Sequence, residues 1–132
     1  MSQTDPISDF LTCIRNASRI KRESVDVPAS RVKAALAEAL KAEGFIRDVK
    51  LLPDEKQGRI RVYLKYGGDG ERVITSIQRL SKPGRRRYCG VEEIPTVRNG
   101  LGVAFVSTPL GILSDRECRS RKVGGELVCA VY

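Results

Sequence analysis

The sequence predicts an α/β protein of the α+β type, built from two small lobes, and three observations support this fold class. Helix-like and strand-like apolar patterns alternate over residues 1–66, a glycine-rich stretch follows at 67–70, and strand-like runs dominate residues 71–132. A chain of 132 residues suffices for one domain or for two small lobes sharing a core. We therefore expect an N-terminal α/β lobe, a glycine-rich linker and a mainly β C-terminal lobe with one short helix.

The N-terminal lobe is predicted to begin with a helix followed by a short strand. Asp5 is a good N-cap and Pro6 suits the first helical position, where its missing N–H costs nothing. Apolar residues then recur at helical spacing as far as Ala17. The alternating stretch 24–27 predicts a strand that stops at Pro28.

A second helix is expected between Ser30, which would cap it, and Gly44, which is placed for a left-handed stop. Arg31 and Lys33 lie in its first turn, where positive charge opposes the helix dipole. We find no structural reason for these two cations in the sequence. A phosphate docked on the helix N-terminus would supply one. The predicted buried face comprises Val32, Ala35, Leu36, Ala39 and Leu40.

Two strands complete the N-terminal lobe. Residues 46–52 form an apolar-rich run, and residues 59–66 alternate cleanly between two faces. The outer face is basic and aromatic, so it is either simply solvated or in contact with RNA. The inner face would carry Ile60, Val62, Leu64 and Tyr66, and the outer face Arg59, Arg61, Tyr63 and Lys65.

The C-terminal lobe is predicted to open with a strand of irregular alternation over 73–80 and a strongly basic turn. Such turns are commonly just solvated, but this one offers charge for phosphates and a ring for stacking. We favour the binding role because the same lobe carries the polar loop described next. Residues 91–102 predict only a turn or short helix. The turn contains Lys82, Arg85, Arg86, Arg87 and Tyr88.

The most informative stretch is a polar loop between a predicted strand at 103–106 and a helix beginning at Ser114. Ser114 and Glu117 fit a capping box, with Leu113 and Cys118 at the hydrophobic-staple positions. A stiff, exposed loop loses little entropy on binding and is typical of recognition, although an ordinary strand-to-helix connection has the same pattern. The loop residues are Ser107, Thr108, Pro109, Leu110 and Gly111.

A last strand is expected at 126–132, after Gly124 and Gly125 end the short helix. Glu126 is the one acidic residue that we place in the site. Its carboxylate would repel phosphate, but it can accept hydrogen bonds from a base amino group or hold a neighbouring loop.

Composition and charge favour a polyanionic partner. The formal net charge is +8 and the pI about 9.6. The sequence has no apolar run near the roughly 18 residues of a membrane span and no secretory apolar segment, so we expect a cytosolic protein without a membrane partner. The four cysteines lack C-x-x-C spacing and no histidine accompanies them, which argues against a zinc site or another metal cofactor.

The sequence also argues against an enzyme. With no histidine a Ser-His-Asp triad is impossible, and no phosphate-binding P-loop motif occurs. The adjacent acidic pairs lie in predicted turns, so neither a catalytic site nor a small-molecule substrate is expected. DNA binding ranks behind RNA binding, because no helix is typical of a helix-turn-helix recognition helix.

Four separated motifs resemble the family of the eighth protein of the bacterial small ribosomal subunit. They are Asp-Pro-Ile-Ser-Asp-Phe-Leu-Thr at 5–12, Ser-Lys-Pro-Gly-Arg-Arg at 81–86, Asn-Gly-Leu-Gly at 99–102, and the C-terminal stretch from 107 that includes Gly-Gly-Glu. They occur in the family's order and span nearly the whole chain. One departure stands out, because Pro109-Leu110 replace the Ser-Lys usual in the family.

This resemblance implies a two-lobed, non-catalytic protein in the cytoplasmic ribosome. Its members bind the central domain of 16S rRNA directly, help to order assembly and contact neighbouring small-subunit ribosomal proteins. By resemblance, Ser107, Thr108 and Gly111 contact sugar, phosphate and base edges, while Tyr88 and Glu126 flank them. The basic turn, Arg31 and Lys33 would hold phosphates. A translational repressor that binds a messenger RNA through the same surface remains the alternative.

Overall fold

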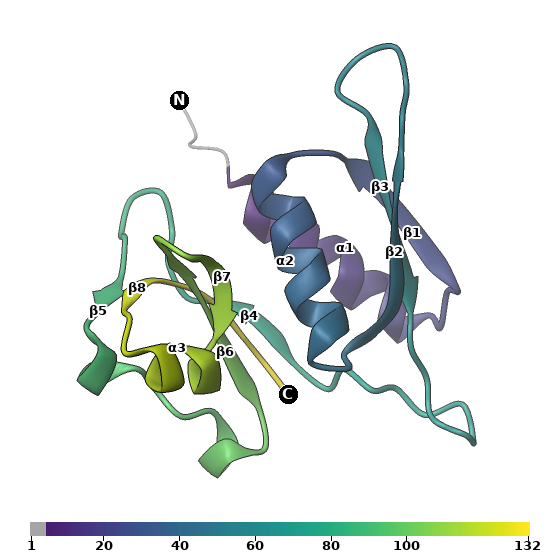
Figure 1. Cartoon of the computed structure of the whole chain (residues 1–132). Coiled ribbons are helices and arrows are strands. Elements are labelled where there is room, and N and C mark those ends of the chain that lie inside the picture. The colour runs from purple at the N-terminus through teal and green to yellow at the C-terminus, as the bar shows by residue number, and fades with distance from the viewer. Residues whose placement is uncertain (1–4) are drawn as a thin grey trace. The chain divides into compact units, whose positions relative to one another are not determined.

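Three α-helices and two antiparallel sheets make up residues 5–132, the part of the chain that the computed structural model describes (Figure 1). The expected α+β class with an N-terminal and a C-terminal lobe is confirmed. Contacts group Ile7–Thr75 into one unit, and Asp5, Pro6 and Ser76–Tyr132 into the other. The lobe boundaries expected near the glycine-rich stretch stay a prediction. No helix among these residues has the length and apolar character needed to cross a membrane.

Two helices lie on the same side of a three-stranded sheet in the N-terminal unit (Figure 1). The helices are α1 (Pro6–Arg19) and α2 (Arg31–Ala42). The sheet has the order β1-β3-β2, with β1 (Ser24–Pro28), β2 (Ile46–Leu52) and β3 (Arg59–Leu64). Each of the five elements was predicted close to its observed position.

The apolar pattern of β3 places one face of this sheet in the core. Ile60, Val62 and Leu64 are buried, as their alternation predicts. Each such side chain, when fully buried, contributes about 1.5–3 kcal/mol to the free energy of unfolding. The helices supply the opposing layer with the buried residues Phe10, Leu11, Ile14, Ala17, Leu36, Ala37 and Leu40.

Both ends of α2 follow their sequence signals. Ser30 Oγ accepts a hydrogen bond from the Lys33 N–H at 3.2 Å. At the other end, the N–H groups of Gly44 and Phe45 donate to carbonyls of the last turn. Gly44 has φ +84°, which a glycine adopts without steric cost, so the helix stops where predicted.

The predicted buried face of α2 is partly wrong. Leu36, Ala37 and Leu40 are buried, whereas Val32 and Ala35 are exposed. The core-facing stripe is therefore rotated toward Ala37. Small and apolar residues occur all round this helix, so periodicity could not determine which of them face the sheet.

Two predicted strands prove shorter than expected. Strand β3 ends at Leu64, and the Tyr66 hydroxyl instead donates to the Arg22 carbonyl at 2.6 Å. The strand expected over 73–80 is reduced to Ile77–Arg79, which pairs with the end of the last strand. Ile74 is buried without belonging to a strand, which produced the misleading apolar pattern.

The C-terminal unit is built on a five-stranded sheet. Its main path is β4-β8-β6-β7, with β5 also paired to β8. The strands are β4 (Ile77–Arg79), β5 (Tyr88–Cys89), β6 (Val103–Thr108), β7 (Gly111–Ser114) and β8 (Gly125–Val131). Two 3₁₀ turns at 91–93 and 98–100 confirm the prediction of only short structure there.

The predicted strand-to-helix loop is a β-hairpin. Strand β6 continues through Thr108 and β7 begins at Gly111, so only Pro109 and Leu110 lie outside the ladder. The expectation of a five-residue loop is thus wrong. Ile112 pairs with Ser107 and Gly111 pairs with Thr108 at the end of β6. Strand β7 is only four residues long, so its apolar–polar alternation is too short to predict a strand. The pairing with β6 depends on burial in the folded chain.

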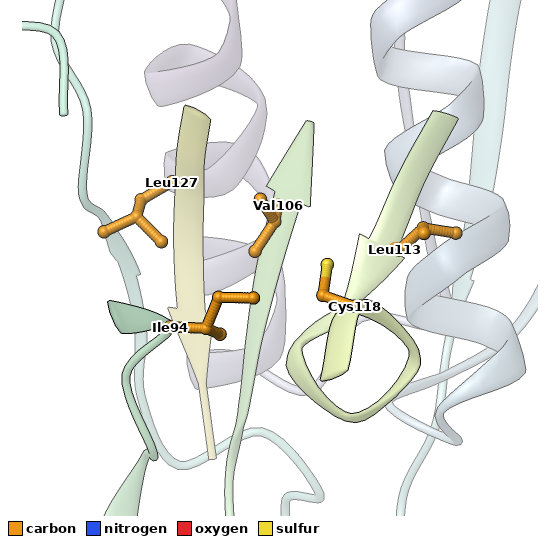
Figure 2. Close-up of a cluster of buried hydrophobic side chains, with 5 residues drawn as sticks. All are labelled: Ile94, Val106, Leu113, Cys118 and Leu127. Atoms are coloured by element: carbon orange, nitrogen blue, oxygen red, sulfur yellow. The ribbon is translucent and has the colours of Figure 1, made fainter. Parts of the chain in front are cut away.

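The helix after the hairpin has the predicted cap. In α3 (Asp115–Arg121), Ser114 Oγ accepts a hydrogen bond from the Glu117 N–H at 3.2 Å. The helix stops at Lys122 in the left-handed conformation, φ 55°, rather than at the glycines that follow. The two staple positions share one buried cluster, whose members are Ile94, Val106, Leu113, Cys118 and Leu127 (Figure 2).

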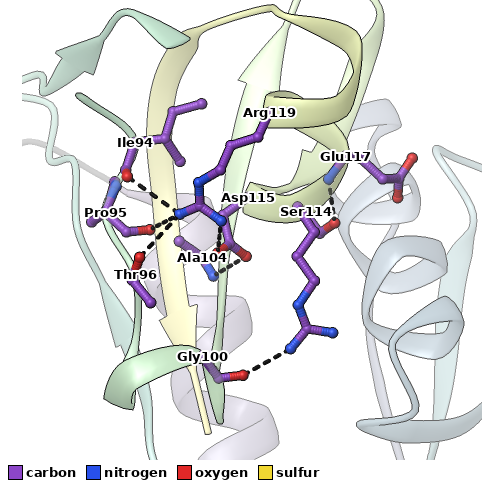
Figure 3. Close-up of polar contacts among 10 residues, drawn as sticks. Ile94, Pro95, Thr96, Gly100, Ala104, Ser114, Asp115, Glu117 and Arg119 are labelled. Atoms are coloured by element: carbon purple, nitrogen blue, oxygen red, sulfur yellow. Dashed lines mark hydrogen bonds and ion pairs between the residues drawn. The ribbon is translucent and has the colours of Figure 1, made fainter. Parts of the chain in front are cut away.

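A buried carboxylate joins α3 to β6 and, through Arg119, to the loop before β6 (Figure 3). Asp115 is 2% exposed, and its two oxygens accept from the Ala104 N–H at 3.3 Å and from Arg119 at 3.0 Å. The Arg119 guanidinium also donates to three oxygens of the loop before β6. The negative charge of the buried Asp115 is therefore compensated by a backbone N–H and by the Arg119 guanidinium. The loop oxygens belong to Ile94, Pro95 and Thr96.

A second, almost buried ion pair lies within the same unit. The Arg79 side chain is 7% exposed and donates to Asp5 at 3.0 Å and to the Val128 carbonyl at 2.8 Å. Asp5 was predicted only as a helix cap, so this link between residues 74 positions apart was not foreseen.

The cysteines are unpaired, and no group of three or more metal-binding side chains occurs among the described residues. Cys118 and Cys129 are buried, whereas Cys13 is partly exposed. Burial raises the pKa of the Cys129 thiol to about 12. This thiol is therefore protonated at neutral pH and packs as a small apolar group.

Replacing the cap of α3 should destabilise the chain. Ser114→Ala removes the acceptor of the Glu117 N–H, which should cost about 0.5–2 kcal/mol in the free energy of unfolding. Urea unfolding measures this cost. Ser120→Ala, an exposed serine of the same helix, is the control and should change stability little. Equal effects of the two substitutions would show that the cap bond contributes nothing specific.

Removing Asp5 should leave the Arg79 charge nearly buried without its acid. Asp5→Ala should lower the free energy of unfolding by up to about 3–5 kcal/mol. Arg79→Met in the same chain should recover most of that loss, because the unpaired charge is then gone. Thermal and urea unfolding of both variants test this, with the exposed Asp9→Ala as control. Failure of Arg79→Met to restore stability would mean that the charge was not the cause.

Candidate nucleic-acid interface

The sheet register places three distant predicted site residues side by side. Glu126 of β8 lies opposite Tyr88 on one side and opposite Ser107 on the other, and Ser107 faces Ile112 of β7. Directly opposed residues of antiparallel strands point to the same face of a sheet. Tyr88, Glu126, Ser107 and Ile112 therefore form one row across four strands, which we call the Ser107 row.

The Ser107 row lies on the side of the sheet opposite the buried cluster. The next residues along the strands, Val106 and Leu127, belong to the cluster that packs beside α3. Since side chains alternate along a strand, Ser107 and Glu126 point the other way. Tyr88 is 69% exposed and Ser107 is also exposed, so a ring and a hydroxyl lie at the surface of the sheet.

The two hydroxyls of the hairpin differ in what they already bind. Within residues 5–132, the Ser107 hydroxyl has no hydrogen-bond partner. The Thr108 Oγ1 instead donates to the Gly111 carbonyl at 2.7 Å and accepts from the Leu110 N–H at 3.0 Å. Thr108 thus holds the turn closed, while Ser107 keeps its full capacity for an external partner.

Two glycines allow the strands of the row to meet. A Cβ atom on Gly125 would collide with the Ser107 carbonyl, and one on Gly124 with the Cys89 carbonyl. Both collisions are with backbone, which cannot move aside without breaking the ladder. The sequence predicted these glycines only as a helix stop. Their second role, close approach between strands, became visible from the pairing.

Glu126 fixes the basic turn beside the row. Its Oε2 accepts from the Ser81 hydroxyl at 2.7 Å and from Arg86 Nη1 at 3.0 Å, and Ser81 Oγ accepts in turn from the Arg87 N–H. Burial raises the pKa of Glu126, but the bonds from Ser81 and Arg86 outweigh it and lower that pKa overall. The group is therefore ionised at neutral pH. Ser81, which is fully buried, was missed as a site residue.

The four cations of the basic turn are all exposed, and among residues 5–132 one of them is ion-paired while the other three have no ion-pair partner. Lys82 and Arg85 exchange two backbone hydrogen bonds, at 3.1 and 2.9 Å, which close the turn. Together with Arg79 and Arg87 they line a hollow of about 400 Å³. Arg86 is instead engaged by Glu126. The hollow concentrates positive charge and so can accept a phosphate.

The two predicted cations of α2 belong to the N-terminal unit and are not part of the Ser107 row. Lys33 Nζ donates to the Pro28 carbonyl at 3.1 Å, so this lysine does have a structural reason to be there. The expectation that neither cation had one is wrong for Lys33. The Arg31 side chain is exposed and has no hydrogen-bond partner among residues 5–132.

Comparison with known proteins identifies the family. The family model described as ribosomal protein S8 matches residues 5–132. A protein of Leuconostoc mesenteroides is 58% identical over 132 residues, and one of Enterococcus faecalis is 54% identical over the same length. A protein of Lysinibacillus sphaericus is 55% identical. All three are named small ribosomal subunit protein uS8, and each match covers 100% of both chains.

The predicted resemblance is thereby confirmed over essentially the whole chain. The family consists of structural proteins of the small ribosomal subunit and not of enzymes, which agrees with the missing catalytic motifs. The chain belongs to the ribosomal protein S8 family.

Proposed function

We propose that this chain binds the central domain of 16S rRNA directly and helps to order the assembly of that domain. The observation that carries the proposal is the Ser107 row. It presents a free hydroxyl, an aromatic ring and an ionised carboxylate on one face, beside a cationic turn. Membership of a family of small-subunit ribosomal proteins supports rRNA as the polyanion that this surface accepts.

The groups of the site suit different parts of an RNA helix. A-form RNA exposes 2′-hydroxyls and base edges in a shallow minor groove, which the Ser107 hydroxyl and the hairpin tip can reach. The exposed Tyr88 ring can stack on an unpaired base. We expect the cations Lys82, Arg85 and Arg87, which line one hollow, to hold phosphates, and such contacts fix orientation without reading sequence.

Glu126 acts mainly by holding the turn in place. Its Oε2 is occupied by Ser81 and Arg86, whereas Oε1 has no hydrogen-bond partner within residues 5–132. That oxygen remains able to accept from a base amino group. A rigid, internally satisfied turn loses little entropy when RNA binds, which raises affinity.

The hairpin tip differs from the family pattern in a way that alters its chemistry. Pro109 and Leu110 stand where the family usually has a hydroxyl and a cation, and Leu110 is 58% exposed. We propose that Pro109 restricts the turn and offsets part of the lost contact. Arg31, at the start of α2, would add a phosphate contact. Lys33, whose Nζ is held by Pro28, would contribute charge only.

The remaining partners follow from the same proposal. We expect contacts with neighbouring small-subunit ribosomal proteins and a cytoplasmic location within the ribosome. Crosslinking in cells, followed by sequencing of the bound RNA, tests the choice of RNA. Predominant recovery of the 16S central domain supports the proposal. Predominant recovery of one messenger RNA would replace it with translational repression.

Ser107 should contribute to discrimination between RNA sequences, whereas a lysine at position 110 should add only electrostatic affinity that is independent of sequence. Ser107→Ala should weaken binding of matched 16S RNA by about 1–3 kcal/mol and leave scrambled RNA and the salt dependence unchanged. Leu110→Lys should strengthen both RNAs alike and steepen the log–log salt slope by about one. Titrations at several salt concentrations measure both effects, with Ser120→Ala as control. Equal weakening of both RNAs by Ser107→Ala would remove Ser107 from the role of reader.

The ionised Glu126 should also make the chain sensitive to acid. Because the folded-state pKa lies below the ordinary 4.5, ionised Glu126 stabilises the fold at neutral pH, and this contribution disappears as pH falls through the folded-state pKa. Glu126→Gln should therefore lose stability at neutral pH and decline less than the unaltered chain on acidification. Urea midpoints from pH ~7 to ~3 test this. Parallel declines would show that other carboxylates account for the acid sensitivity.

A further inference from the structure

The helix-free face of the N-terminal sheet carries a second concentration of positive charge. The register pairs Arg61 of β3 with Asp26 of β1 on one side and with Lys50 of β2 on the other. Opposed residues share a face, and the neighbouring β3 residues Ile60 and Val62 are buried under the helices. Arg61 and Lys50 therefore lie on the open side of the sheet, together with Arg59 and Tyr63 at alternate positions of β3.

Three arginines on this face line a hollow of about 400 Å³. They are Arg22, which precedes β1, with Arg59 and Arg61 of β3; Asp26 is the one acidic residue in the lining. Arg61 donates to Asp26 from Nε at 2.8 Å and from Nη2 at 3.1 Å. We call these four residues the arginine hollow. Its formal charge is +2, because one carboxylate faces three guanidinium groups.

The ion pair explains only one of the three arginines. Within residues 5–132, the side chains of Arg22 and Arg59 have no hydrogen-bonded or ion-paired partner. The pKa of Asp26 is lowered chiefly by its bonds from Arg61, and further by the charges of Arg59 and Arg22. The Asp26 carboxylate is therefore ionised at neutral pH. A purely structural role accounts for Asp26 and Arg61 but leaves two like charges gathered beside them.

The donors of the hollow match a phosphate. A guanidinium has five N–H groups; Arg61 uses two of them for Asp26 and also interacts with the Tyr63 hydroxyl, which leaves the others for a second acceptor. The bidentate bond also fixes the orientation of Arg61, so that little side-chain entropy remains to be lost. Arg22 and Arg59 can add donors, and one phosphodiester charge would neutralise half of the excess.

The positive charge continues past the hollow along the sheet. Two cations lie over the Tyr63 ring: Arg47 Cζ is 5.0 Å and Lys50 Nζ is 5.4 Å from the ring centre. Cations thus extend across the face from Arg22 to Lys50; beyond them Arg47 is ion-paired with Glu23 at 3.6 Å, and Asp48 lies opposite Tyr63 in the register. A single free phosphate requires one site only, whereas a row of cations beside an aromatic ring suits a polyanion with exposed sugars and bases.

We propose that this face is a second RNA-contacting surface, in which Arg22, Arg59 and Arg61 hold one backbone phosphate. The inference rests on the proposed function, since it takes the rRNA of that function as the ligand. It assigns to the N-terminal sheet a share of the affinity that does not depend on sequence. The Ser107 row in the other unit then supplies the discrimination.

The test compares two neighbouring charge-removing variants in the full chain. Arg59→Gln removes a cation of the hollow. Lys56→Gln removes one from the exposed loop three residues earlier and serves as the matched control. Binding to a transcript of the 16S central domain is titrated at several salt concentrations, after circular dichroism and urea unfolding confirm equal folding. Arg59→Gln should lower the log–log salt slope by about one, and Lys56→Gln should leave it unchanged.

Footprinting of the same complexes supplies the second readout. Hydroxyl-radical protection lost in Arg59→Gln should be lost at the same nucleotides in Arg22→Gln, because both arginines hold one phosphate. Those nucleotides should differ from the ones exposed by Ser107→Ala. The inference would be overturned if Arg59→Gln and Lys56→Gln had equal salt slopes. It would also be overturned if Arg59→Gln lost protection at the same nucleotides as Ser107→Ala.

The two proposals fail in distinguishable ways. If the unaltered chain does not prefer the 16S central domain over scrambled RNA, the proposed function is wrong. A lowered slope confined to Arg59→Gln would then still support a phosphate site on this face. If the preference is present and the slopes of Arg59→Gln and Lys56→Gln agree, the proposed function stands and the second surface is wrong.

Discussion

Close approach of backbones at Gly124 and Gly125 is the constraint on which the candidate site depends. Any side chain there would collide with the carbonyls of Cys89 and Ser107, so β8 could not pair with β5 and β6 at this register. The pairing in turn creates the Ser107 row. Without it the ring, the carboxylate and the hydroxyl would belong to separate segments. Two glycines therefore determine where Tyr88, Glu126 and Ser107 come together.

Compensated charges hold this arrangement rigid. Asp115 and Arg119 fasten α3 to β6 and to the loop before it, Arg79 of β4 binds Asp5, and Glu126 of β8 holds the basic turn through Arg86. Compared with apolar groups in their place, such pairs add little net stability, because desolvation offsets most of the attraction, although removal of one partner alone is costly. Their value lies in geometry: each removes an alternative position for the segment it holds. Under the proposed function, the hairpin and the basic turn then bind RNA with little conformational entropy left to lose.

The charge distribution suggests a division of labour between the two units. In the C-terminal unit, polar groups with unused hydrogen-bonding capacity adjoin the cations, which favours discrimination among RNAs. In the N-terminal sheet, the arginine hollow offers charge with few groups that could read a base. The proposed role in ordering rRNA assembly would use both, since phosphate contacts accelerate encounter and specific contacts select the final position.

The sequence by itself determined the fold class, the caps of α2 and α3, most strands and the family, because these follow from local periodicity, capping chemistry and motif order. Tertiary structure alone decided that residues 107–111 form a hairpin, and that Val32 and Ala35 of α2 face outward. It also decided which hydroxyl of the hairpin is free, that Ser81 supports Glu126, and that Asp5 neutralises Arg79. These features depend on contacts between residues far apart in the chain or on the register of paired strands. Local patterns carry no information about either, since the same apolar or polar residue fits several partners until the whole core is packed.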